Sequence, residues 1–158
     1  MKKYVLAVLA VVAFASLQGF AATTATLNLT GTVSPTLSVS VAPTQAASTL
    51  DLTLDVTDLV VAAVTEKSNM ASGYDLWVTS ANKGAFAGVN ADRLGYAFMF
   101  GSTSLDLSAE FSPILGDYNA KTSQAGLVSA VSISYSGSAA NLFAGAYTDT
   151  VTFTIAAK

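Results

Sequence analysis

A run of alternating residues near the N-terminus constrains this chain more than any other feature. From residue 25 to residue 41 every odd position is apolar, Gly or Pro, and every even position from Thr26 to Ser40 is Thr, Asn or Ser. Such alternation is typical of a β-strand with one buried face. At roughly 3.3 Å per residue the run would extend about 56 Å. A domain of about 140 residues has a radius of gyration near 14 Å, so it cannot bury this stripe along a straight line.

The run can be accommodated in two ways. Either the chain bends at Pro35 and folds back as two strands, or one half of the run packs elsewhere. Proline favours an extended conformation in the residue before it, so Ser34-Pro35 suits a kink better than a reversal. We therefore predict that residues 22–34 form an N-terminal extension whose acceptor is another molecule. The alternative is an ordinary first strand of a self-contained domain.

Shorter runs with the same period continue through residues 35–158. Leu59 to Val64 is continuously apolar and fits a buried strand or one short helix, whereas residues 103–125 are less periodic and fit a long loop or an edge excursion. Turn-forming pairs such as Ser72-Gly73 separate the runs. Seven to nine short strands predict an all-β fold, an immunoglobulin-like antiparallel β-sandwich. The apolar stripes include Tyr74, Leu76 and Val78, with Trp77 opposite, then Leu127, Val131, Ile133 and Tyr135.

The first 21 residues have the pattern of a secretion signal. Lys2 and Lys3 precede an apolar run of about 12 residues, and Gly19 and Ala21 provide the small residues of a cleavage site. The run is shorter than the roughly 20 residues that a membrane-spanning helix needs. We expect residues 1–21 to be removed on export through the inner membrane, leaving no integral membrane span; the alternative is an uncleaved anchor.

Composition excludes several classes of function. The chain has no His and no Cys, which rules out Ser-His-Asp triads, Cys nucleophiles, disulfides and metal sites built on imidazole or thiolate. Without Lys2 and Lys3, five of the 7 Lys and Arg residues remain against 10 Asp and Glu residues. An acidic chain is a poor nucleic-acid binder, because binding phosphates requires basic surface. We expect no enzymatic activity, no cofactor and no metal.

The early segment Leu27-Asn-Leu29-Thr-Gly31-Thr-Val33 resembles the donor strands of chaperone–usher pilins. In that family each subunit is an incomplete immunoglobulin-like sandwich, completed by the N-terminal extension of the next subunit. The resemblance implies that Leu27, Leu29 and Val33 fill pockets in a neighbouring subunit. It also implies that Gly31 lies where the acceptor groove is shallow.

The C-terminal run from Gly145 to Ile155 resembles the closing strand of pilins and of spore-coat-protein-U-like fimbrial subunits, which often carry a Gly-x-Tyr-x-Asp-x-Val pattern. The resemblance implies that this strand edges the groove and receives a chaperone strand before the donor strand. It further implies a periplasmic chaperone and an usher as partners, besides identical or related pilin subunits. The groove-edge residues are Tyr147, Val151, Phe153 and Ile155.

Other polar and aromatic residues are interpreted as structural. Asp51 and Asp55 would lie about 13 Å apart on one strand face, too far to share one ion. We expect Asp92-Arg93 and Glu66-Lys67 to be surface charges that protect exposed edges from mispairing. Trp77 is expected to pack under a loop, with stacking on a sugar ring as the alternative.

The sequence as a whole predicts an exported structural subunit of a surface fibre that assembles by donor-strand exchange and serves adhesion. It would reside in a cell-surface fibre, in the periplasm or outside the cell. The first alternative is a self-contained secreted β-sandwich that binds a carbohydrate or protein ligand. An outer-membrane β-barrel and a Ser/Lys hydrolase fit less well, since several strands are short and the four Lys residues after the signal lie in polar or terminal contexts.

Overall fold

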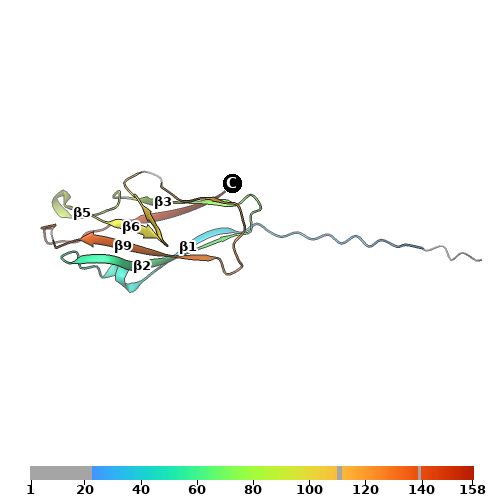
Figure 1. Cartoon of the computed structure of the whole chain (residues 1–158), viewed down its shortest axis with the longest axis horizontal. Helices are drawn as coiled ribbons and strands as arrows, with labels where there is room; N and C mark the ends of the chain where they lie inside the picture. The colour runs from blue at the N-terminus through green and yellow to red at the C-terminus, as the bar shows by residue number, and fades with distance from the viewer. Residues whose placement is uncertain (1–22, 110–111, 139) are drawn as a thin grey trace, which may run out of the picture. The chain divides into compact units, whose positions relative to one another are not determined.

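A computed structural model of the chain describes residues 23–109, 112–138 and 140–158, with side chains left undescribed over 112–117 (Figure 1). The expected secretion signal, residues 1–21, lies outside the described residues. The chain divides into two units, residues 1–32 and 33–158. In the first unit the described residues, 23–32, form neither helix nor strand, and all of them are exposed.

The second unit is all-β and sandwich-like, as predicted, with two antiparallel sheets facing each other (Figure 1). The larger sheet has the strand order β1-β2-β9-β6-β7 and the smaller has β10-β3-β8. The strands of the larger sheet are β1 (Leu37–Pro43), β2 (Asp55–Ser68), β9 (Leu127–Ser136), β6 (Ala97–Phe100) and β7 (Thr103–Leu105). Those of the smaller sheet are β10 (Val151–Ala157), β3 (Tyr74–Ser80) and β8 (Ser112–Tyr118).

Short elements connect these strands. Strands β4 (Ala85–Ala87) and β5 (Arg93–Gly95) form a two-stranded hairpin, and the described residues also form the 3-10 helices η1 (Gln45–Ser48) and η2 (Val89–Ala91). The turn at Ser72-Gly73 requires its glycine. Gly73 has a φ of 84°, and a Cβ there would lie 1.7 Å from the carbonyl oxygen of Tyr118.

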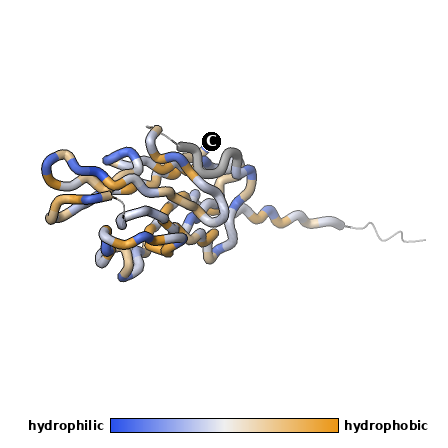
Figure 2. The backbone as a smooth tube through the Cα atoms, turned by 60° about the vertical axis from the view of Figure 1, so that its left-hand side comes forward, coloured by the Kyte–Doolittle hydropathy of each residue, from blue (hydrophilic) through white to orange (hydrophobic). Residues whose placement is uncertain are grey.

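Alternation of apolar and polar residues positions the core between the sheets. Hydrophobic and hydrophilic stretches follow one another along the backbone (Figure 2). On β3 the side chains of Tyr74, Leu76 and Val78 are each 1% exposed, while Trp77 faces the other way and is half-buried. The predicted shared face is therefore confirmed. The core also contains Val64, Phe86, Phe98, Phe100, Val131, Ile133 and Tyr135.

The two ambiguous segments are strands in the structure. The apolar run from Leu59 to Val64 belongs to β2, whose register against β9 shifts twice, between Val56 and Leu59 and between Val60 and Ala62. These irregularities interrupt the period-two pattern and made the run look continuous. The aperiodic region 103–125 contributes β7 and β8, each an edge strand of its sheet.

The structure corrects the expectation for Glu66. It was predicted to be a surface charge beside Lys67, but its side chain is 0% exposed and points between the sheets from β2. The hydroxyl of Tyr74 donates a hydrogen bond to its carboxyl group, with 3.0 Å between the oxygens. In the sequence an acidic residue beside a lysine is typical of a surface position, so the sequence alone did not predict that Glu66 is buried.

The long N-terminal run does not form one continuous strand. Regular pairing begins at Leu37, which lies opposite Ser68 of β2. Asn69 fixes the entry to β1, since its Oδ1 accepts a hydrogen bond from the backbone N–H of Thr36 and its Nδ2 donates to the carbonyl of Ser34. Residues 23–36 lie in no strand.

Candidate functional site

Two edge strands from different sheets lie beside each other. In the described part of the chain β1 is paired only with β2, and β10 only with β3, so each has an edge without a partner strand. The two strands approach each other across the opening between the sheets. An unpaired edge presents a row of backbone N–H and C=O groups that can pair with another strand.

A groove opens between β1 and β10 and reaches the core. It encloses a cavity of about 340 Å³ with walls from Val41 and Pro43 on one side and Val151 and Phe153 on the other. Its remaining lining is mostly apolar and includes Phe86, Phe98, Val131 and Ile133, together with Asp149 and Thr150. The groove therefore offers apolar pockets alongside free backbone groups, the combination that binds an added strand.

Burial along the groove differs from burial elsewhere in the sandwich. The inward-facing residues of β10, Val151, Phe153 and Ile155, are only half-buried, and Val41 on β1 is 47% exposed. The equivalent inward positions of β3 are 1% exposed. The contrast marks the gap between β1 and β10 as the part of the core that the second unit leaves uncovered.

The predicted groove-edge residues divide into two groups. Val151, Phe153 and Ile155 share the inward face of β10, opposite Ser80, Val78 and Leu76 of β3. Tyr147 lies before the strand. Its hydroxyl is 3.0 Å from Oδ2 of Asp92 and 2.8 Å from the carbonyl oxygen of Phe143. These contacts make Tyr147 a hydrogen-bonding anchor of the loop before β10, and burial and the Asp92 carboxylate raise its pKa.

Asp149 fixes the point at which β10 begins. Its Oδ2 accepts hydrogen bonds from the hydroxyls of Ser80 at 2.6 Å and Tyr96 at 2.5 Å. Its Oδ1 accepts from the backbone N–H groups of Asn82 at 2.9 Å and Thr150 at 2.7 Å. Burial, and then the bond to Asp149, raise the pKa of Tyr96. The prediction from sequence did not include Asp149, although it occupies the Asp position of the Gly-x-Tyr-x-Asp-x-Val pattern.

The predicted donor residues are exposed. Leu27, Leu29 and Val33 are 80%, 84% and 87% exposed, and a Cβ added at Gly31 would meet nothing within 4 Å. The segment from Leu27 to Val33 and β10 each contain seven residues, or about 20 Å of extended chain. The segment therefore matches β10 in length and, like β10, alternates apolar and polar residues.

A second hollow of about 760 Å³ lies between the loops around residues 47–53 and 142–149. It shares Ala47, Leu50, Phe86 and Asp149 with the groove, and its lining is more polar. Phe143, on one rim, is 58% exposed. The groove thus continues into a wider opening beyond the start of β10.

The two aspartates that the sequence analysis considered as possible ion ligands form hydrogen bonds with neighbouring protein groups. Asp51 accepts hydrogen bonds from the side chain and the backbone of Thr53, and these bonds, the side-chain bond most, lower its pKa. Asp55 accepts hydrogen bonds from Ser138. No group of three or more potential metal ligands occurs among the described residues. Within those same residues no helix is long and apolar enough to cross a membrane.

No protein-family model matches the chain, and no curated protein is significantly similar to it in sequence.

Proposed function

We propose that this protein is an exported structural subunit of a surface fibre, without enzymatic activity, which assembles by donating residues 27–33 to the groove of another copy. The observation that carries the proposal is the pairing of an uncovered apolar groove with an exposed apolar segment of matching length and period. Adhesion is the role we assign to such a fibre. A periplasmic chaperone that occupies the groove before assembly, and an usher, are part of the same proposal.

The energetics favour a lasting joint. Burying the side chains of Leu27, Leu29 and Val33 would contribute roughly 1.5–3 kcal/mol each. Each backbone hydrogen bond to β1 or β10 would add about 1 kcal/mol net. A subunit without a donor strand exposes its apolar groove, and an exposed apolar groove favours association with another molecule.

Strand direction favours an open chain of subunits. Leu37 of β1 lies opposite Ser68, and a short turn leads from Ser68 to Tyr74, which lies opposite Ala157 of β10. The beginning of β1 and the end of β10 are therefore at the same end of the sandwich, so the two strands run in opposite directions. A donor strand parallel to β1 would leave the groove near Pro43, at the other end. Joints of this kind are heterologous and repeat without closing.

The opposite direction gives a different product. A strand that reverses at Ser34–Thr36 to reach the groove of its own chain must run antiparallel to β1. A donor from another copy in that direction would enter near Pro43 and leave near Leu37, which suits a closed exchange of two subunits. We assign the parallel direction, since it extends a fibre.

Cysteine cross-linking tests both the donor and its direction, because the chain has no Cys. Thr32→Cys with Thr152→Cys places one thiol on the outward face of the donor and one on the outward, exposed face of β10. Strands that run parallel to β1 would bring these positions together near the start of β10, within the Cα separation of about 4.4–6.8 Å that a disulfide needs. We expect a ladder of covalent oligomers on a non-reducing gel.

The matched control is Asn28→Cys with Thr152→Cys, which moves the donor thiol to the far end of the segment. A ladder from the control pair but not from the first pair would reverse the assigned direction. If neither pair cross-links between molecules while the protein stays monomeric, donation to another copy is wrong.

A self-contained secreted β-sandwich that binds a carbohydrate or protein ligand is the second candidate. The hollow between the 47–53 and 142–149 loops favours it, since it combines polar and apolar lining with the exposed ring of Phe143. A binding module would remain monomeric at all concentrations, and removal of residues 22–33 would leave its ligand binding unchanged.

A further inference from the structure

A buried carboxyl group lies at the end of the sandwich where β1 begins. Glu66 of β2 is 0% exposed and lies opposite Val39 of β1 and Leu127 of β9. Its side chain points toward the smaller sheet, where Tyr74 donates the 3.0 Å hydrogen bond to Oε2. Nothing in the proposed strand exchange uses this group.

The hydrogen bonding around Glu66 is incomplete. Its Oε1 is buried and has no hydrogen-bond partner, and the same holds for the hydroxyl of Tyr118. The ring of Tyr118 stacks on that of Tyr74, with centroids 4.6 Å apart and planes inclined by 12°. A carboxylate would leave an uncompensated charge in this aromatic setting, whereas a protonated carboxyl group removes that charge and gains an O–H donor.

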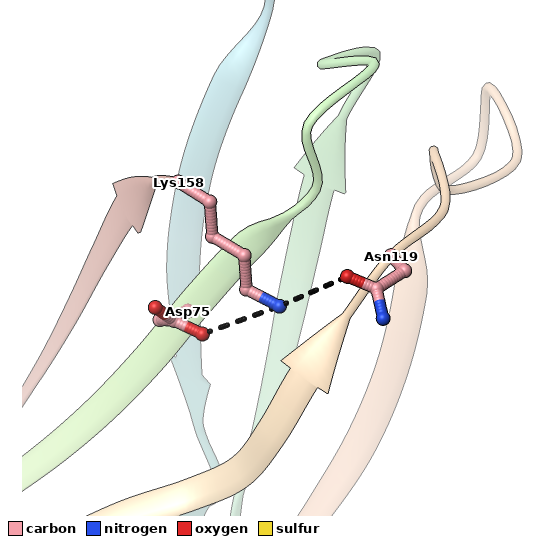
Figure 3. A network of polar contacts seen from close by, with 3 residues as sticks. All are labelled: Asp75, Asn119 and Lys158. Carbon is pink, nitrogen blue, oxygen red and sulfur yellow. Dashed lines mark hydrogen bonds and ion pairs between the residues drawn. The ribbon is translucent and has the colours of Figure 1, made fainter.

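No cation among the described side chains balances Glu66. The strand β1 has no titratable residue, and in β9 the only one is Tyr135, which pairs with Val56 at the far end of β2. Lys67 adjoins Glu66 on β2 but alternates to the other face. Lys158 follows β10, and its Nζ is directed at Asp75, 3.6 Å away, and at Asn119, 3.4 Å away (Figure 3). The described titratable groups facing Glu66 are thus the two tyrosines.

The directions in which the surroundings move these pKa values agree with the geometry. Burial raises the pKa of Glu66 and outweighs the hydrogen bond from Tyr74, which lowers it. Burial, followed by the charge of Glu66, raises the pKa of Tyr118 to about 12. In both groups the shift is toward the neutral form.

We propose that Glu66 is a proton-binding site inside the sandwich, which keeps its proton above the pH range in which an exposed glutamate ionises, so that acidification stabilises the end of the fold where β1 begins. The sign follows from linkage. A raised folded-state pKa contributes stability that is fully present below the unfolded pKa and is lost as pH rises through the folded pKa. This inference does not depend on strand exchange.

The sequence allows a direct titration, because the chain contains only two glutamates, Glu66 and Glu110. Protein labelled with ¹³C at the glutamate side-chain carboxyl carbon should give two NMR resonances, assigned by the Glu110→Gln variant. We expect the Glu66 resonance to shift at a pH clearly above the ordinary value of about 4.3. A transition at or below that value would overturn the proposal, and this measurement needs no change at Glu66.

Denaturant unfolding gives the second test. The urea midpoint of wild type and of Glu66→Gln should match near pH 4, and the variant should unfold at the higher urea concentration near pH 8. Asp51→Asn is the control, with a pH dependence of opposite sign. The pKa of Asp51 is lowered, so its contribution to stability is lost as the pH falls. If wild type and Glu66→Gln differ by the same amount at every pH, Glu66 does not bind the proton.

Discussion

Residues 27–33 and strand β3 have the same alternating pattern, but their apolar side chains differ in burial. On β3 the inward side chains of Tyr74, Leu76 and Val78 are 1% exposed, because the opposite sheet covers them. In the N-terminal segment Leu27 and Leu29 are at least 80% exposed. Alternation therefore predicts which side chains share a face, and leaves open which surface covers that face.

Deleting residues 22–33 should have the largest effect on assembly, because it removes the uncovered segment. The truncated protein should fold, since the groove strands β1 and β10 and the whole core lie within residues 33–158. It should form no fibres at concentrations where the full chain polymerises, as judged by electron microscopy and sedimentation. Fibres from the truncated protein would show that another surface drives assembly.

Leu76→Ala and Leu29→Ala compare a covered with an uncovered leucine. Truncating the buried Leu76 should lower the free energy of unfolding by about 2–5 kcal/mol. In dilute monomer Leu29→Ala should change it by less than about 0.5 kcal/mol, as for an exposed site. Urea unfolding measures both, and a large loss from Leu29→Ala in the monomer would mean that the chain covers its own segment.

Gly31→Leu and Thr30→Leu compare neighbouring positions of opposite phase. Only the odd positions of the segment would enter pockets, because a strand alternates its faces. Overpacking by Gly31→Leu should cost about 1–3 kcal/mol at each joint and slow polymerisation in a light-scattering assay. The Thr30→Leu variant should polymerise close to the wild-type rate, and equal slowing by both would contradict this phase.

Asp149→Asn tests the acceptor side, because Asp149 fixes the start of β10. The amide keeps one acceptor oxygen but replaces the other with a donor, which disrupts bonds from Ser80 and Tyr96 or from Asn82 and Thr150. We expect a loss of about 1–3 kcal/mol in unfolding free energy, from leaving partly buried groups unsatisfied. The exposed Asp58→Asn variant is the control, and an equal loss there would remove the special role of Asp149.

The sequence predicted the parts of the fold that depend on local patterns. The period-two stripe of Tyr74, Leu76 and Val78 identified the inward face of β3, and turn residues located the turn at Ser72-Gly73. The register shifts in β2 could not be predicted, since they depend on pairing with β9. The burial of Glu66 depends likewise on Tyr74 and Tyr118 from the opposite sheet.

The candidate site was predictable to a similar extent. The resemblance assigned Tyr147, Val151, Phe153 and Ile155 to the strand that edges the groove. The last three share the inward face of β10, whereas Tyr147 lies before the strand begins. The groove itself arises because the strands β1 and β10, far apart in sequence, have facing free edges. The role of Asp149 also comes from partners distant in sequence, so spacing gave no signal for it.

Hydrogen exchange of the backbone amides of residues 27–33, followed by mass spectrometry across a dilution series, tests the donor role most directly. Strand pairing with another copy predicts strong protection in concentrated, assembled protein and exchange near the unfolded rate once dilution yields monomers. Protection that persists unchanged in the monomer at every dilution would show that the segment is a strand of its own domain.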